Sequence, residues 1–156
     1  MTILEQLRAY WERQGIANPR LATTGELAAF ETHHVVKLPS LIADYFLAVN
    51  GTKEGECMME GEDLISFWHL DQLKTVKEHY QDDSIADANR LFVFADHSID
   101  CYSWAVRLSS DPSADTPVVI SYLDRPIART FEAFLDGYLR REKWALYPDP
   151  PGKPLP

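Results

Sequence analysis

Three potential metal ligands lie within five residues of one another, at positions 96 to 100. Asp96, His97 and Asp100 offer carboxylate oxygens and an imidazole nitrogen, which are donor types that bind zinc and other divalent cations. The same residues suit a β-turn, because aspartate side chains accept hydrogen bonds from nearby backbone N–H groups. A small metal-dependent enzyme centred on these residues is therefore the least favoured of three hypotheses, and we predict no metal and no cofactor.

The other residues that could do chemistry do not form a recognisable set. His33 and His34 are adjacent, so on a helix their side chains point about 100° apart and do not easily share one metal ion. The sequence contains no GxSxG, CxxC, HExxH, GxxxxGK or GxGxxG motif, which excludes the nucleophiles and phosphate sites that have short signatures. A catalytic carboxylate pair is defined by separation in space, so that alternative stays open. We predict that the protein is not an enzyme.

The acidic residues are concentrated in the middle of the chain. Between Glu54 and Asp124 there are 15 acidic and 4 basic residues, whereas the two flanks together carry 9 acidic and 11 basic residues. Such a field repels nucleic acid and membrane surfaces and accelerates encounter with a basic protein. An acidic surface also provides solubility, and charge alone does not separate the two interpretations. We predict a basic protein partner, no nucleic acid and no membrane.

The acidic residues are predicted to form one partner-binding surface with an aromatic anchor. Tryptophan and tyrosine often anchor interfaces, and Tyr102 and Trp104 lie on an alternating segment beside the acidic loop. The alternative for Trp104, as for Trp68, is a place in the hydrophobic core. The predicted partner-binding residues are Glu60, Glu62, Asp63, Asp82, Asp83, Asp87, Asp96, Asp100, Tyr102 and Trp104.

Helices are predicted on both sides of this acidic region. Thr2 with Glu5, and Thr23 with Glu26, have the spacing of capping boxes, so helices are expected to follow both threonines. The second of these helices is predicted over Thr24–His33. A closing helix is expected after a threonine N-cap at position 130.

A third helix is predicted within the segment LPSLIADYFLAVNG, residues 38–51, around which the chain is organised. Pro39 suits the first turn of a helix, and Asn50 and Gly51 suit the left-handed conformation that ends one. The residues that form its apolar stripe are Leu41, Ile42, Tyr45, Phe46 and Val49.

The middle of the chain is predicted to form an antiparallel sheet of four to six short strands. Leu91–Ala95 is continuously apolar, as in a strand covered on both faces, whereas Cys101–Arg107 alternates. Helical spacing predicts a helix over His69–Tyr80. The other predicted strands are Cys57–Met59, Leu64–Trp68 and Val118–Leu123.

These elements predict an α+β fold with N-terminal helices and a C-terminal helix packed on the sheet. Residues 1–146 are expected to form a single domain, and the proline-rich residues 147–156 a mobile tail. No apolar run reaches the 18 residues of a membrane span, and the charged N-terminus is not a signal peptide. The expected location is the cytoplasm, with Cys57 and Cys101 reduced and partly buried.

Five motifs follow one another over about residues 20 to 142: ELAAFETHHVVKLP, the helix closed by Asn50-Gly51, SFWHLDQL, FADHSIDCYSWAV and RTFEAFLDGYL. Their order resembles the SUKH superfamily, which contains a yeast cell-wall-assembly regulator and many bacterial toxin-immunity proteins. The chain has Ile99 where the superfamily usually has a glycine before the aspartate of the acidic loop. The resemblance implies an immunity protein that neutralises a cognate toxin, often a nuclease. A regulatory or scaffolding module of the cell-wall-regulator type is the second hypothesis.

Overall fold

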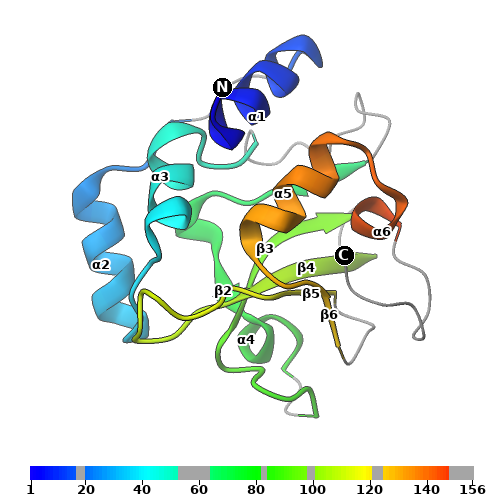
Figure 1. Cartoon of the computed structure of the whole chain (residues 1–156). Helices are drawn as coiled ribbons and strands as arrows, with labels where there is room; N and C mark the ends of the chain where they lie inside the picture. Colours follow the sequence, from blue (N-terminus) through cyan, green and yellow to red (C-terminus); the bar gives the residue numbers. More distant parts are fainter. Residues whose placement is uncertain (17–19, 53–63, 82–83, 98–100, 121–124, 148–156) are drawn as a thin grey trace.

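The sheet and helices of the chain are seen in a computed structural model that describes residues 1–16, 20–52, 64–81, 84–97, 101–120 and 125–147. Helices and a six-stranded antiparallel sheet confirm the predicted α+β class (Figure 1). The helices are α1 (Ile3–Arg13), α2 (Thr24–His34), α3 (Ser40–Ala48), the 3-10 turn η1 (Leu70–Gln72), α4 (Val76–Tyr80), α5 (Phe131–Leu139) and α6 (Lys143–Leu146). The strands are β1 (Ile65–Phe67), β2 (Lys74–Thr75), β3 (Leu91–His97), β4 (Tyr102–Arg107), β5 (Val118–Ile120) and β6 (Pro126–Ala128).

Strand β3 lies in the middle of the sheet. The strand order is β1-β3-β4-β5-β6, and β2 pairs with β3 on the same side as β1. All described pairings are antiparallel. Residues 91 to 95 of β3 are all buried, which confirms the prediction from their continuous apolar run.

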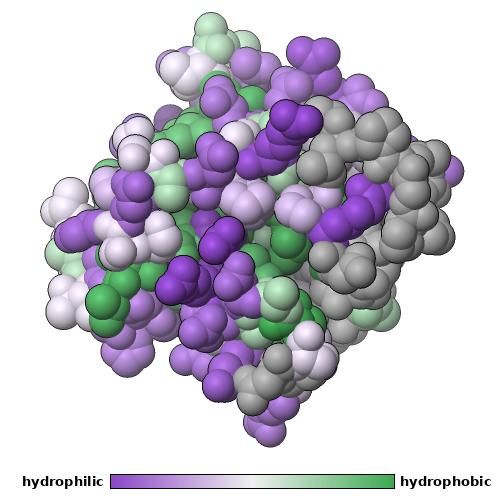
Figure 2. Space-filling model, turned by 60° about the horizontal axis from the view of Figure 1, so that its bottom comes forward, coloured by the Kyte–Doolittle hydropathy of each residue, from purple (hydrophilic) through white to green (hydrophobic). Residues whose placement is uncertain are grey.

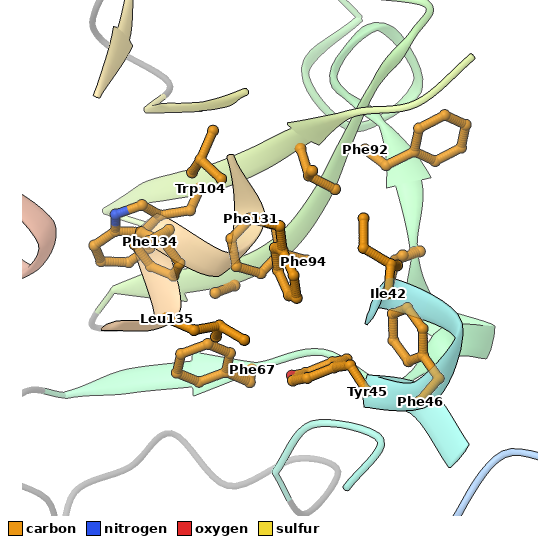
Figure 3. Packing of buried hydrophobic residues seen from close by; sticks show 14 of the residues in the cluster. Ile42, Tyr45, Phe46, Phe67, Phe92, Phe94, Trp104, Phe131, Phe134 and Leu135 are labelled. Atoms are coloured by element: carbon orange, nitrogen blue, oxygen red, sulfur yellow. The ribbon is translucent and has the colours of Figure 1, made fainter. Parts of the chain in front are cut away.

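The two faces of the sheet are covered unequally. Helices α1, α3 and α5 cover one face, and the main hydrophobic core lies beneath them. Figure 3 shows how aromatic side chains fill this core, with Tyr45 and Phe46 of α3 on one side and Phe131 and Phe134 of α5 on the other. The opposite face carries α4 and a smaller core around Val93. Alternation along β4 explains this division, because Trp104 belongs to the main core and Ala105 to the smaller one.

Both predicted capping boxes are present. Thr2 and Glu5 cap α1, and Thr23 and Glu26 cap α2, each through reciprocal hydrogen bonds between side chain and backbone. These bonds satisfy N–H groups that have no partner inside the helix, so they fix where each helix begins.

The central segment ends as its sequence predicts. Asn50 and Gly51 have φ values of 48° and 78°, and an added Cβ at Gly51 would lie 2.6 Å from the Phe67 carbonyl oxygen. The side chain of Asn50 is buried and ties three segments together. Its amide nitrogen donates to the Arg20 carbonyl at 2.6 Å, and its amide oxygen accepts from the Leu70 N–H at 2.9 Å.

The single helix predicted over His69–Tyr80 is wrong. This stretch divides into η1, β2 and α4. The physical reason lies in Thr75, which is extended with φ −67° and ψ 156°, and which forms a capping box with Glu78. A capping threonine begins a new helix, so helical spacing across it does not indicate one continuous helix.

The C-terminal part contains two elements that were not predicted, β6 and α6. Thr130 caps α5 as expected, through a bond from the Ala133 N–H at 3.0 Å. Trp144 of α6 then packs so closely on Gly137 of α5 that an added Cβ would lie 2.2 Å from the indole ring. Cys101 is exposed, which corrects its predicted partial burial. Cys57, the predicted strand Cys57–Met59 and residues 148–156 of the predicted tail lie outside the described residues.

Candidate partner-binding surface

Several strands begin or end together at one end of the sheet. Ile65, at the start of β1, lies opposite His97 at the end of β3, and His97 lies opposite Tyr102 at the start of β4. Ile120 at the end of β5 pairs with Trp104 of β4, and β6 begins nearby at Pro126. Helix α6 lies on the same side (Figure 1). We call this the α6 end of the sheet.

Three links that attach at the α6 end carry most of the excess negative charge. They are residues 53–63, 98–100 and 121–124, and they contain seven acidic residues and one basic residue. The links themselves lie outside the described residues, but the described strands fix where they attach. Four of the predicted partner-binding residues belong to them: Glu60, Glu62, Asp63 and Asp100.

One other predicted residue, Asp87, belongs to the opposite end of β3. Asp87 precedes the start of β3, and its carboxylate pairs with the Arg107 guanidinium at 3.2 Å. Asp82 and Asp83 lie outside the described residues, between the end of α4 and Asp87 in sequence. A seven-residue strand is about 20 Å long, so β3 separates Asp87 from the α6 end of the sheet by roughly that distance.

The backbone does not support the least favoured hypothesis, a shared ion site at Asp96, His97 and Asp100. Asp96 and His97 are neighbours within β3, where successive side chains point to opposite faces of the sheet. The Asp96 carboxylate accepts a 2.5 Å hydrogen bond from the half-buried Trp68 indole, while the His97 ring stacks on Tyr102. Asp100 lies outside the described residues, among which no three His, Cys, Asp or Glu residues form a metal-binding group.

An aromatic group lies at the α6 end, on the described elements to which the acidic links attach. The rings of Tyr102 and His97 are parallel with centroids 4.6 Å apart, and the ring of Tyr147 lies 5.9 Å from His97. Tyr102 is half-buried, its hydroxyl donates to the Leu146 carbonyl, and Tyr147 is 44% exposed. Tyr102 is therefore partly accessible at the α6 end of the sheet, and its role in partner binding stays a prediction. The sequence did not show that His97 and Tyr147 belong to this aromatic group. The pairing of β3 with β4 places His97 beside Tyr102, and the position of α6 places Tyr147 near His97.

Trp104 is not available as an anchor. Its side chain is fully buried in the main core, and its indole N–H donates to the Ala145 carbonyl of α6 at 3.1 Å. The core alternative is the correct one. The residue joins α6 to the sheet, so it positions the aromatic group without forming part of the surface.

A hollow that was not predicted from the sequence lies along α2. It has a volume of about 300 Å³, and one wall is the stripe of α2 formed by Glu26, Ala29, Phe30 and His33. The facing wall is formed by Leu70 and Asp71 of η1 and by Leu73, which precedes β2. We call it the α2 groove. The spacing i, i+3, i+4 and i+7 of these four residues indicates in the sequence that they share one face of a helix. The sequence does not indicate that the small and polar side chains on this face leave a hollow.

His33 and His34 line the α2 groove and also a neighbouring, wider hollow. Thr75, Lys77 and Glu78 line that second hollow as well. The His34 ring packs on Phe30 and Phe92, with centroids 4.5 and 5.0 Å away. Burial, and then the neighbouring His33, lower the pKa of His34, while Glu78 acts in the opposite direction. Neutral imidazole is therefore the favoured form of His34 at neutral pH.

No protein-family model matches the chain, and a search of curated proteins finds no match. None of the helices in the described part of the chain is long and apolar enough to cross a membrane.

Proposed function

We propose that the chain is a non-enzymatic binding protein that neutralises a basic protein toxin, such as a nuclease, in the cytoplasm of the producing cell. The proposal joins the resemblance to the SUKH superfamily with the distribution of charge over the fold. The observation that carries it is the α6 end of the sheet, where three links bring seven acidic residues against one lysine.

The acidic links supply the long-range part of the proposed recognition. A single exposed ion pair contributes little affinity, so the links are not proposed to act as separate salt bridges. Their summed field attracts a basic surface before contact and raises the association rate. A nuclease needs a basic surface for phosphate groups, and an acidic protein that covers it also blocks substrate.

The aromatic group supplies the short-range part. Tyr102 is held by the His97 ring and by its bond to the Leu146 carbonyl, so little rotamer entropy remains to be lost on binding. Tyr147 is the most exposed ring of the group. Burial of these rings against a partner would slow dissociation, as aromatic residues do at interface hot spots.

Binding kinetics with a neighbouring gene product test the proposal. The product of the adjacent gene is purified, and its association with the chain is measured at low and high salt. Reversing the charges of the α6 end should lower the association rate at least about tenfold at low salt. The variant is Glu60→Lys, Glu62→Lys, Asp63→Lys and Asp100→Lys.

A matched variant at the other end of β3 provides the control. Asp82→Lys, Asp83→Lys and Asp87→Lys together change the net charge nearly as much, but they should leave the association rate within about threefold. Equal loss in both variants would mean that overall charge matters and not the α6 end. Binding independent of salt would contradict the acidic mechanism, and a partner that is neither basic nor toxic would favour the regulatory or scaffolding alternative.

A further inference from the structure

The α2 groove combines an apolar floor with charged rims. Ala22, Ala29, Phe30 and Leu73 line it, and the two alanines leave the space that larger side chains would fill. Its volume of about 300 Å³ is at the lower limit for small ligands and suits one long side chain. Figure 2 shows a face of the molecule on which hydrophilic residues lie between separate hydrophobic areas. A hollow of this kind fits a ligand with both apolar and polar parts.

The polar groups of the groove differ in what they already bind. The Asn50 side chain is engaged by the Arg20 carbonyl and the Leu70 N–H. The Glu26 carboxylate accepts from the Thr23 N–H and pairs with the Arg20 guanidinium at 2.8 Å. Asp71 is exposed and forms no hydrogen bond or ion pair with the rest of the described chain. Its carboxylate is therefore the unused charge of the groove.

We infer that the α2 groove is a receptor site for an arginine side chain of the partner protein. The aliphatic stem would lie on Ala29 and Leu73, and the guanidinium would meet the Asp71 carboxylate at the rim. Apart from its histidines, the groove carries two carboxylates, Glu26 and Asp71, against the Arg20 guanidinium, so a further cation balances its charge. The inference rests on the proposed function, because a basic partner is what brings an arginine to the groove.

Arginine fits better than lysine for two reasons. A planar guanidinium stacks on aromatic rings, and Phe30, His33 and His34 all line the groove. A guanidinium also binds a carboxylate through two parallel hydrogen bonds, whereas an ammonium acts as a point charge. The ion pair of Arg20 with Glu26 shows that a guanidinium and a carboxylate already meet at the rim.

Titration with short peptides tests the inference on the full chain without the partner. The probe is acetyl-Ala-Arg-Ala-amide, and the control is the same peptide with citrulline, which has the same shape without the charge. Amide chemical shifts in NMR should change for residues of the groove wall, including Ala29 and Asp71. The arginine peptide should bind about fivefold more tightly than the citrulline peptide.

Three variants make the result decisive. Asp71→Asn should reduce arginine binding to the citrulline level, and Ala29→Leu should abolish binding of both peptides by filling the groove. Asp44→Asn, an exposed carboxylate on α3 outside the groove, should change neither. Equal binding of the two peptides, shift changes elsewhere on the surface, or arginine binding that survives Asp71→Asn would overturn the inference. The charge-reversal variant at the α6 end should still bind the arginine peptide. Loss of partner binding in that variant is therefore distinguishable from loss of arginine binding in the α2 groove.

Discussion

Two buried polar groups, the Tyr45 hydroxyl on α3 and the Asn50 amide just after α3, differ in whether they have hydrogen-bond partners. Asn50 is 3% exposed, and both ends of its amide are hydrogen-bonded. Tyr45 is fully buried, and its hydroxyl has no hydrogen-bond partner among the described residues. Burial accordingly raises the pKa of the Tyr45 hydroxyl well above its ordinary value. The amide holds segments together, whereas the hydroxyl only pays a desolvation cost.

Removal of the Tyr45 hydroxyl should therefore stabilise the protein. We expect Tyr45→Phe to raise the free energy of unfolding by about 1 kcal/mol, because an unsatisfied buried hydroxyl disappears and the ring stays. The matched control is Tyr138→Phe, whose hydroxyl accepts a 3.0 Å bond from the buried Trp11 indole. That change should lower the free energy of unfolding by about 1 kcal/mol. Urea denaturation of both variants gives the two signs, and destabilisation by Tyr45→Phe would reveal a partner for its hydroxyl.

At the scale of elements, a glutamate fixes the link between α2 and α3. The Glu31 carboxylate accepts a bond from the Leu38 N–H at 2.9 Å and pairs with the Lys37 ammonium at 3.0 Å. The Leu38 N–H, followed by Lys37, lowers the pKa of Glu31. The folded protein thus stabilises the ionised form of Glu31 more than the unfolded chain does. The stabilisation is present above the unfolded pKa of about 4.3 and is lost as pH falls through the lower folded pKa.

Glu31→Gln should show this dependence on pH. At pH 7 we expect the variant to lose about 1 kcal/mol in free energy of unfolding, because an amide cannot supply the charge. Below pH 4 the difference from the unchanged protein should shrink, since Glu31 becomes neutral as well. Glu12→Gln, at an exposed position on α1, serves as control and should stay within about 0.5 kcal/mol at every pH. A difference that stays constant down to pH 2 would rule out the charged contact as the cause.

The contact of α5 with α6 depends on the absence of a side chain at Gly137. Gly137→Ala would place a Cβ 2.2 Å from the Trp144 ring, so α6 must move or the variant must unfold more easily. We expect a loss of at least about 2 kcal/mol, within the range for overpacked cores, together with a change in Trp fluorescence. Gly25→Ala on α2 is the matched control. Its Cβ would have no neighbour closer than 3.8 Å, and the better helix former should give a gain of up to about 1 kcal/mol.

The elements that could be predicted are those whose signals are local. Capping boxes at Thr2 and Thr23 act within four residues, and both helices begin where these signals place them. Strand β6 and helix α6 have no such signal. Pro126 pairs at the edge of the sheet, and α6 is held by Trp104 and by the space over Gly137, which are contacts between distant residues. A local sequence pattern contains no information about such contacts.

At the scale of the whole molecule, the sequence identifies the charged residues of the candidate surface but not their arrangement. Charge counting identified the acidic residues, and four of them belong to links at one end of the sheet. The strand register, which no spacing rule gives, moves Asp87 to the other end and turns Asp96 and His97 to opposite faces. The α2 groove depends on the distance between two elements that are 40 residues apart, so the sequence contained its residues without showing their proximity.

The concentration of acidic residues at the α6 end has a consequence for the free protein. Glu60, Glu62 and Asp63 lie within four residues of each other, and Asp63 is two residues from Ile65, which pairs with His97 next to the link that contains Asp100. Chain length keeps these charges within the range of electrostatic repulsion at low salt, and the repulsion disfavours the folded chain. If the α6 end is the proposed binding surface, it costs stability until a partner neutralises it.

Stability should therefore rise with salt, and the α6 end should account for the rise. Raising the ionic strength from about 0.01 M to about 0.15 M shortens the screening length from about 30 Å to about 8 Å and should increase the melting temperature. A variant with Glu60→Gln, Glu62→Gln, Asp63→Asn and Asp100→Asn should be more stable at low salt by about 1 kcal/mol and respond less to added salt. The control variant Asp82→Asn, Asp83→Asn and Asp87→Asn loses the ion pair of Asp87 with Arg107 and should gain less. Calorimetry across the salt range distinguishes the two, and an equal gain in both would show that the net charge of the chain acts as a whole, without a concentrated surface at the α6 end.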